Sequence, residues 1–129
     1  MKTMARNGLL RALILLGLIF LVLQAIQAKD EPAELKEEGI NIIDILQNVT
    51  AYEGKMVVIE GKIETECPSG CWFIIDDKTA SIYVDILPSN FVIPQKRGED
   101  AKVYGKMTTR NGDPMIIGEM VEINGEIYQ

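Results

Sequence analysis

The sequence predicts an all-β fold, a small five-stranded Greek-key barrel with a short helix at its N-terminal side. Stretches in which apolar and polar residues alternate with period two begin at residue 56 and recur until residue 123, as strands with one buried face require. Gly61 interrupts the first and longest stretch, where a strand that joins both sides of a closed barrel must bend. The one extended connection, residues 87–100, separates the third stretch from the fourth.

The elements follow in order along the chain. Apolar residues at helical spacing from Ile42 to Val49 predict a short helix over residues 41–48 that covers one end of the barrel. Strands are predicted at residues 56–66, 71–77, 80–86, 101–107 and 115–123. Residues 77–80 have the composition of a tight hairpin turn, and Asn111-Gly112 is the strongest hairpin signal in the chain. Pro88 and Pro94 leave room for one helical turn at most in the long connection.

Several runs resemble the pattern of the oligonucleotide/oligosaccharide-binding (OB) fold over residues 40–123. They are Val57-Val-Ile-Glu-Gly-Lys-Ile63, Trp72-Phe-Ile-Ile-Asp-Asp77 and Val103-Tyr-Gly-Lys106. The segment Cys67-Pro-Ser-Gly-Cys-Trp72 also resembles exported, membrane-anchored bacterial and archaeal OB-fold proteins of unassigned function that carry Gly-Cys-Trp at this strand start. The resemblance implies a binding role and leaves the ligand open, because such barrels bind oligonucleotides, sugars, metals, peptides and haem.

The first 28 residues have the layout of a signal peptide or a transmembrane anchor. Lys2, Arg6 and Arg11 precede an apolar run over residues 12–23, and the small residue Ala28 follows. Cleavage after Ala28 and retention in the membrane both fit this pattern. In either case the domain is expected on the extracytoplasmic side, membrane-anchored or secreted. Residues 29–39 predict an acidic linker, and residues 40–129 the barrel domain.

Composition excludes several classes of function. The chain has no His, the side chain most used for acid–base catalysis near neutral pH and for metal binding. From Asp30 onward it has 9 Lys and Arg against 19 Asp and Glu, a net charge of −10. Because neutralising phosphates supplies most of the affinity for nucleic acids, this charge argues against such a partner. It favours a neutral or cationic ligand, or a protein.

A candidate ligand-binding face follows from the strand pleat. If Phe73, Ile75, Ile82 and Val84 point inward, the residues between them point outward. The candidate ligand-binding residues on that outward face are Trp72, Ile74, Ser81, Tyr83 and Asp85. Its aromatic rings would suit stacking against a base, a sugar ring or a partner side chain. In the alternative, the N-terminal segment or residues 87–100 cover these groups as part of the core.

Cys67 and Cys71 enclose a five-residue turn between the first two strands. In an exported domain such a pair predicts a disulfide. A redox-active pair and a copper or zinc site are the alternatives, and a thioether of Met107, Met115 or Met120 could complete a Cu(I) site. In the alternative, these methionines pack the interior of the barrel and bind no metal. No other cofactor is expected.

The sequence therefore predicts a non-enzymatic, extracytoplasmic binding module. Its surface is the outer face of the second and third strands together with the Cys67–Cys71 turn. Its N-terminal helix would contact the membrane, and its partner would be a protein or a small ligand. A copper or zinc chaperone or a thiol-redox protein acting through the cysteines is an alternative. Single-stranded nucleic-acid binding, which only the resemblance suggests, is another.

Overall fold

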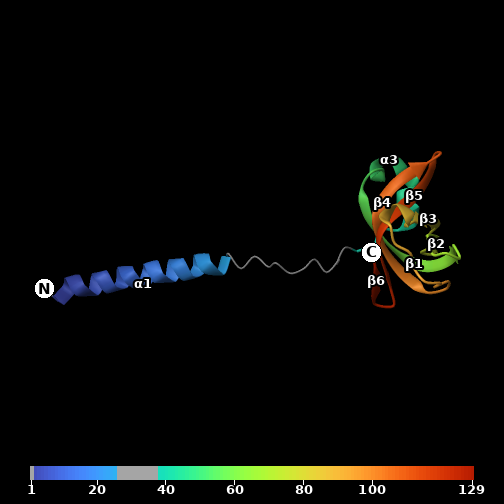
Figure 1. Cartoon of the computed structure of the whole chain (residues 1–129). Helices are drawn as coiled ribbons and strands as arrows, with labels where there is room; N and C mark the ends of the chain where they lie inside the picture. Colours follow the sequence, from blue (N-terminus) through green and yellow to red (C-terminus); the bar gives the residue numbers. More distant parts are fainter. Residues whose placement is uncertain (1, 26–37) are drawn as a thin grey trace. The chain divides into compact units, whose positions relative to one another are not determined.

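The computed structural model describes residues 2–25 and 38–129 (Figure 1). The chain divides into two compact units, Met1–Lys36 and Glu37–Gln129. In the first unit, Lys2–Ala25 forms helix α1. Within the described part of the chain, no helix meets the length and apolarity that a membrane span requires. The cleavage position predicted after Ala28 and residues 29–37 of the predicted linker lie outside the described residues.

Two short helices open the second unit, α2 (Ile42–Gln47) and α3 (Val49–Tyr52). Ile42 and Ile45 are fully buried in the hydrophobic core, as the helical spacing predicted. The turn after the second strand holds the start of α2, because Asp77 Oδ2 accepts the N–H of Ile42 at 2.7 Å and Thr79 Oγ1 accepts that of Ile43 at 3.2 Å. This turn therefore caps a helix that is distant in sequence.

The barrel consists of β1 (Met56–Glu66), β2 (Trp72–Asp76), β3 (Ser81–Asp85), β4 (Asp100–Arg110) and β5 (Asp113–Ile123). Around the barrel the order is β1, β2, β3, β5, β4 and back to β1. All pairs are antiparallel except β3 with β5, whose parallel pairing closes the barrel. The five-stranded closed barrel with a short helix confirms the predicted fold class and fits an OB-fold.

Strand β1 joins the two sides of the barrel. Its residues 56–62 pair with β4 and its residues 62–66 pair with β2, with a register shift between Ile63 and Thr65. A Cβ at Gly61 would overlap the backbone carbonyl of Asp76. The glycine is needed because β2 crosses close to the β1 backbone at the position where β1 changes partner.

The long connection contains one 3₁₀ turn, η1 (Leu87–Ser89). This agrees with the prediction, made from Pro88 and Pro94, that it has room for one helical turn at most. Strands β4 and β5 extend beyond the predicted bounds to Arg110 and Asp113, because the Asn111-Gly112 turn joins them directly. A sixth strand, β6 (Glu126–Tyr128), was not predicted and pairs with β5. Three residues are too few to show a period-two pattern, but the Asn124-Gly125 turn before them was a usable signal.

Candidate binding face and dithiol turn

Trp72, Ile74 and Tyr83 form an aromatic platform on the outward face of β2 and β3. Ile74 lies opposite Tyr83 in the strand pair, and the Trp72 and Tyr83 rings stack with centroids 5.4 Å apart and planes inclined by 26°. All three side chains are half-buried. The residues predicted to point inward between them are all in the buried core; they are Phe73, Ile75, Ile82 and Val84. The platform therefore lies outside the core and keeps part of its apolar surface in contact with solvent.

Asp85 lies beside Trp72 in the strand pair and is only 7% exposed. The guanidinium of Arg110 lies 2.9 Å from its carboxylate, and the N–H of Leu87 donates to it at 3.1 Å. The carboxylate predicted to face a ligand is thus already paired. Its charge beside the platform is neutralised by an arginine that the sequence pattern did not single out.

The polar end of the same face is formed by Asp76, Ser81 and Glu64. The Ser81 hydroxyl lies 2.8 Å from Asp76 Oδ2 and 3.2 Å from Glu64 Oε2. The backbone N–H of Lys78 donates to Asp76 Oδ1 at 2.8 Å. Ser81 therefore orients two carboxylates at the edge of an adjoining pocket.

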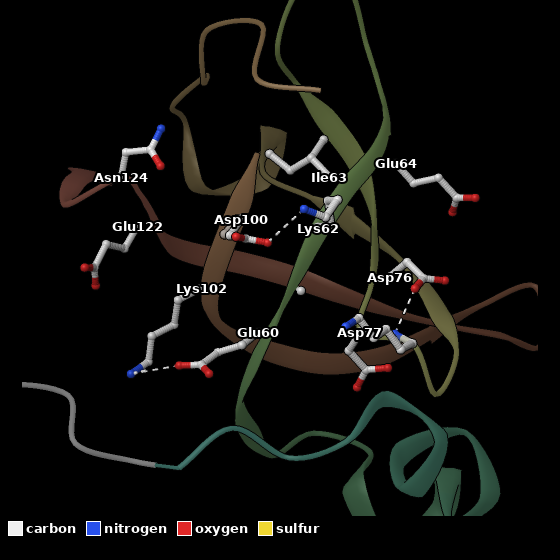
Figure 2. Close-up of a pocket in the computed structure, with 13 residues that line it drawn as sticks. Glu60, Lys62, Ile63, Glu64, Asp76, Asp77, Asp100, Lys102, Glu122 and Asn124 are labelled. Carbon is white, nitrogen blue, oxygen red and sulfur yellow. Dashed lines mark hydrogen bonds and ion pairs between the residues drawn. The ribbon is translucent and has the colours of Figure 1, made fainter. Parts of the chain in front are cut away.

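This acidic pocket has a volume of about 890 Å³ (Figure 2). Lys62 pairs with Asp100 and Lys102 with Glu60, each at 3.4 Å, and these carboxylates are largely exposed. Asp76 links the pocket to the platform, because it lines the pocket and also lies on the outward face of β2 that carries the platform. Six carboxylates and three lysines line the pocket, namely Glu60, Glu64, Asp76, Asp77, Asp100, Glu122, Lys62, Lys78 and Lys102.

Cys67 and Cys71 are free thiols, so the predicted disulfide is corrected by the structure. The thiol of Cys71 donates a hydrogen bond to Cys67 Sγ at 3.0 Å. The hydroxyl of Ser69 lies beside this sulfur pair, 3.0 Å from Cys67 Sγ and 3.7 Å from Cys71 Sγ. We call residues 67–71 the dithiol turn. Spacing alone predicted that the two cysteines lie together, but not the hydroxyl that lies beside them.

The dithiol turn is braced by the connection that follows η1. Gln95 Nε2 donates to the carbonyls of Cys67 and Pro68 at 3.1 and 2.7 Å. The N–H of Ile93 donates to the Gly70 carbonyl at 3.1 Å, and a Cβ at Gly70 would overlap the Ile93 carbonyl oxygen. The turn is therefore held by the Gln95 side chain and by a close backbone contact with Ile93 that only glycine at position 70 permits.

The dithiol turn and the platform are neighbours. Cys71 directly precedes Trp72, and its carbonyl accepts the N–H of Ile86 at 3.1 Å, just beyond β3. Burial raises the pKa of Tyr83, and the Asp85 carboxylate raises it further. Arg110 lowers this pKa, whereas Cys71 and Cys67 raise it. The Tyr83 phenol therefore stays protonated at neutral pH and can donate a hydrogen bond at the platform surface.

Within the described residues, no cluster of three or more His, Cys, Asp or Glu side chains has a geometry that could hold a metal ion. Of the methionines considered as thioether ligands, Met107 is fully buried in the core cluster and Met115 is 4% exposed. Met107 therefore packs the barrel interior rather than facing the cysteines.

The fold and this face define a class of protein, an OB-type barrel with an outward aromatic platform, rather than a named family. No family model matches the chain, and no curated protein matches it. Among solved structures, the chain is similar to the hypothetical protein ygiW from E. coli, with a TM-score of 0.51 and 15% sequence identity. The match covers 67% of this chain and 90% of that one. At this identity the similarity concerns the fold alone.

Proposed function

We propose that this barrel is a non-enzymatic binding module that holds a cationic ligand along the aromatic platform and the acidic pocket. The observation that carries the proposal is the stacked, half-exposed pair of Trp72 and Tyr83 on the outward face of β2 and β3. A buried pair would only pack the core. A pair that remains partly in water offers a flat surface for an apolar or positively charged group.

The charges around the platform select the ligand. Asp85 is neutralised by Arg110, whereas Asp76 and Glu64 lead from the platform into a pocket with six carboxylates and three lysines. A ligand with an amine or guanidinium group would be attracted to this surface, and a polyphosphate would be repelled. A lysine- or arginine-rich segment of a partner protein has this chemistry.

Export and membrane attachment belong to the same proposal and rest on the sequence. The basic flank and the apolar run of the first 28 residues support placement of the barrel on the extracytoplasmic side. Determining the N-terminal residue of the protein recovered from cells tests this. A start at Lys29 or retention of the intact chain in the membrane fraction fits export, whereas an intact chain in the cytosol would refute it.

Trp72 is the only tryptophan of the chain, so its fluorescence reports directly on the platform. We expect a lysine-rich peptide without aromatic residues to change this emission saturably, with weaker binding as salt increases. Tyr83→Ala should abolish the response. Tyr104→Ala removes another half-buried tyrosine, on β4, and should leave it intact.

Oligo(dT) serves as the competing probe in the same assay. We expect no change in Trp72 emission even at low salt, where binding to phosphates is strongest. Binding of oligo(dT) without binding of the peptide would replace the proposal with single-stranded nucleic-acid binding. Peptide binding that Tyr83→Ala does not weaken would move the ligand away from the platform.

A further inference from the structure

We propose that the dithiol turn is a thiol–disulfide exchange site, in which Cys67 is the attacking sulfur and Cys71 the resolving one. The two sulfurs are in contact at 3.0 Å, both side chains are partly exposed, and the Ser69 hydroxyl lies within reach of each. This redox activity is separate from the non-enzymatic binding role proposed for the platform: it uses the dithiol turn alone and does not depend on ligand binding.

The hydrogen bonds give the two cysteines different roles. Cys71 donates and Cys67 Sγ accepts, so the arrangement stabilises the thiolate form of Cys67. The Ser69 hydroxyl, the Cys71 thiol and the backbone N–H of Ser69 lower the pKa of Cys67 from 9.0 to about 7. About half of Cys67 is then thiolate at pH 7, against about one hundredth for a thiol with a pKa of 9, and the thiolate is the nucleophile.

The surrounding structure keeps this arrangement in place. The Gln95 side chain donates hydrogen bonds to the carbonyls of Cys67 and Pro68, and the Gly70 carbonyl accepts a hydrogen bond from the N–H of Ile93. At the start of the turn, the N–H of Cys67 donates to the Trp72 carbonyl at 2.9 Å. Both ends of the turn are therefore fixed by contacts that do not involve either sulfur, so the sulfurs can change their bonding while these contacts persist.

The proposed reaction uses a substrate disulfide as oxidant. The Cys67 thiolate attacks one sulfur of the substrate, and the electron pair of the breaking S–S bond leaves with the other sulfur as a thiolate. Cys71 then transfers its proton to the departing thiolate and attacks Cys67 Sγ, which releases the second substrate sulfur as a thiolate. The substrate disulfide is reduced by two electrons to one thiol and one thiolate, the thiolate can take a proton from solvent, and the cysteine pair is oxidised to a disulfide.

The full-length, reduced protein can be tested with 4,4′-dithiodipyridine, a neutral disulfide that releases a coloured thione. The wild-type protein should release two thiones per chain, the second at a rate that does not depend on probe concentration. Cys71→Ser should release one and retain a single adduct, which peptide mapping places on Cys67. A wild-type chain that instead accumulates two adducts would overturn the proposal, because Cys71 would not be resolving Cys67.

The pH dependence separates an activated thiolate from an ordinary one. For Cys71→Ser, whose hydroxyl can still donate to Cys67, the rate should rise with a midpoint near pH 7. Ser69→Ala should shift that midpoint upward and slow the reaction at pH 7 by up to about fivefold, because the gain in intrinsic nucleophilicity partly offsets the loss of thiolate. A midpoint near pH 9, or equal rates for Cys67→Ser and Cys71→Ser, would refute the assignment while leaving ligand binding on the platform untouched.

Discussion

Arg110, the last residue of β4, places its guanidinium 2.9 Å from the carboxylate of Asp85 at the end of β3. The Asp85 side chain is 10% exposed and the Arg110 side chain 55%. The pair therefore lies at the edge of the aromatic platform. The Asp85 carboxylate is buried there, and the Arg110 side chain is exposed to solvent. Without Arg110 the nearly buried carboxylate would lose its ion pair and keep the hydrogen bond from the N–H of Leu87.

Arg110→Ala should destabilise the protein by about 1–2 kcal/mol, because it leaves the Asp85 carboxylate without its partner. Adding Asp85→Asn should recover part of the loss. Lys62→Ala is the matched control, since Lys62 and Asp100 are both more than half exposed, and it should change stability by less than about 0.5 kcal/mol. Urea unfolding of the variants measures these differences. Equal losses from both pairs would mean that Arg110 has no special role.

Asp77 should make the docking of α2 sensitive to acid. Although burial raises its pKa, hydrogen bonds from Thr79 and from the N–H groups of Ile42, Thr79 and Ala80 lower it below 3.8. A lowered folded-state pKa adds stability that is fully present above the unfolded pKa and is lost as pH falls through the folded value. Asp77→Ala should cost about 1–2 kcal/mol at neutral pH.

Thermal unfolding measured at neutral pH and below pH 4 checks this prediction. The destabilisation caused by Asp77→Ala should shrink as the pH falls further through the lowered pKa of Asp77, because the wild-type carboxylate becomes protonated there. A loss that is the same at both pH values would show that the Asp77 charge does not hold α2.

Gly70 and Gly112 share a positive φ, +74° and +85°, but differ in their surroundings. A Cβ at Gly112 meets nothing within 4 Å, whereas one at Gly70 overlaps the Ile93 carbonyl oxygen. Gly112→Ala should therefore lower the free energy of unfolding only by the strain of a non-glycine residue at positive φ, about 1–2 kcal/mol. Gly70→Ala should cost clearly more and release the dithiol turn. Differential scanning calorimetry compares them, and similar losses would argue against the close contact with Ile93.

Glu122 should contribute to binding of a cationic ligand because it lines the acidic pocket. Glu122→Gln should weaken affinity for a lysine-rich peptide by about two- to fivefold, as expected for one exposed charge contact. Glu119 lies on the same strand but does not line the pocket, so Glu119→Gln should have no effect. Equal effects of both substitutions in a salt titration would indicate general charge attraction without a site.

The fold could be predicted because one pattern repeats in it. Alternation from Trp72 to Asp76 and from Ser81 to Asp85 shows which side chains leave the core, and the strand bounds follow within a few residues. The site could be predicted only where its residues share a strand or adjoin one. The Arg110–Asp85 pair and the Gln95 contacts join segments 25 or more residues apart, and no local signal marks them. The acidic pocket likewise forms only when β1, β4, β5 and the end of β2 with its following turn come together.

The cysteine pair shows a different limit. Spacing and expected export favoured a disulfide, yet the structure has two thiols with the Ser69 hydroxyl beside them. Ser69 can be read directly from the sequence. Its hydrogen bond to Cys67, however, depends on a turn geometry fixed by Gly70, Gln95 and Ile93.

The most direct test of the ligand-binding surface is an NMR titration of the ¹⁵N-labelled full-length protein with the lysine-rich peptide. We predict that the largest shift changes fall on the indole N–H of Trp72 and on the backbone of Ile74, Asp76 and Tyr83. Changes confined to β4, β5 and β6 outside the acidic pocket, or no changes at low salt, would contradict ligand binding on the platform.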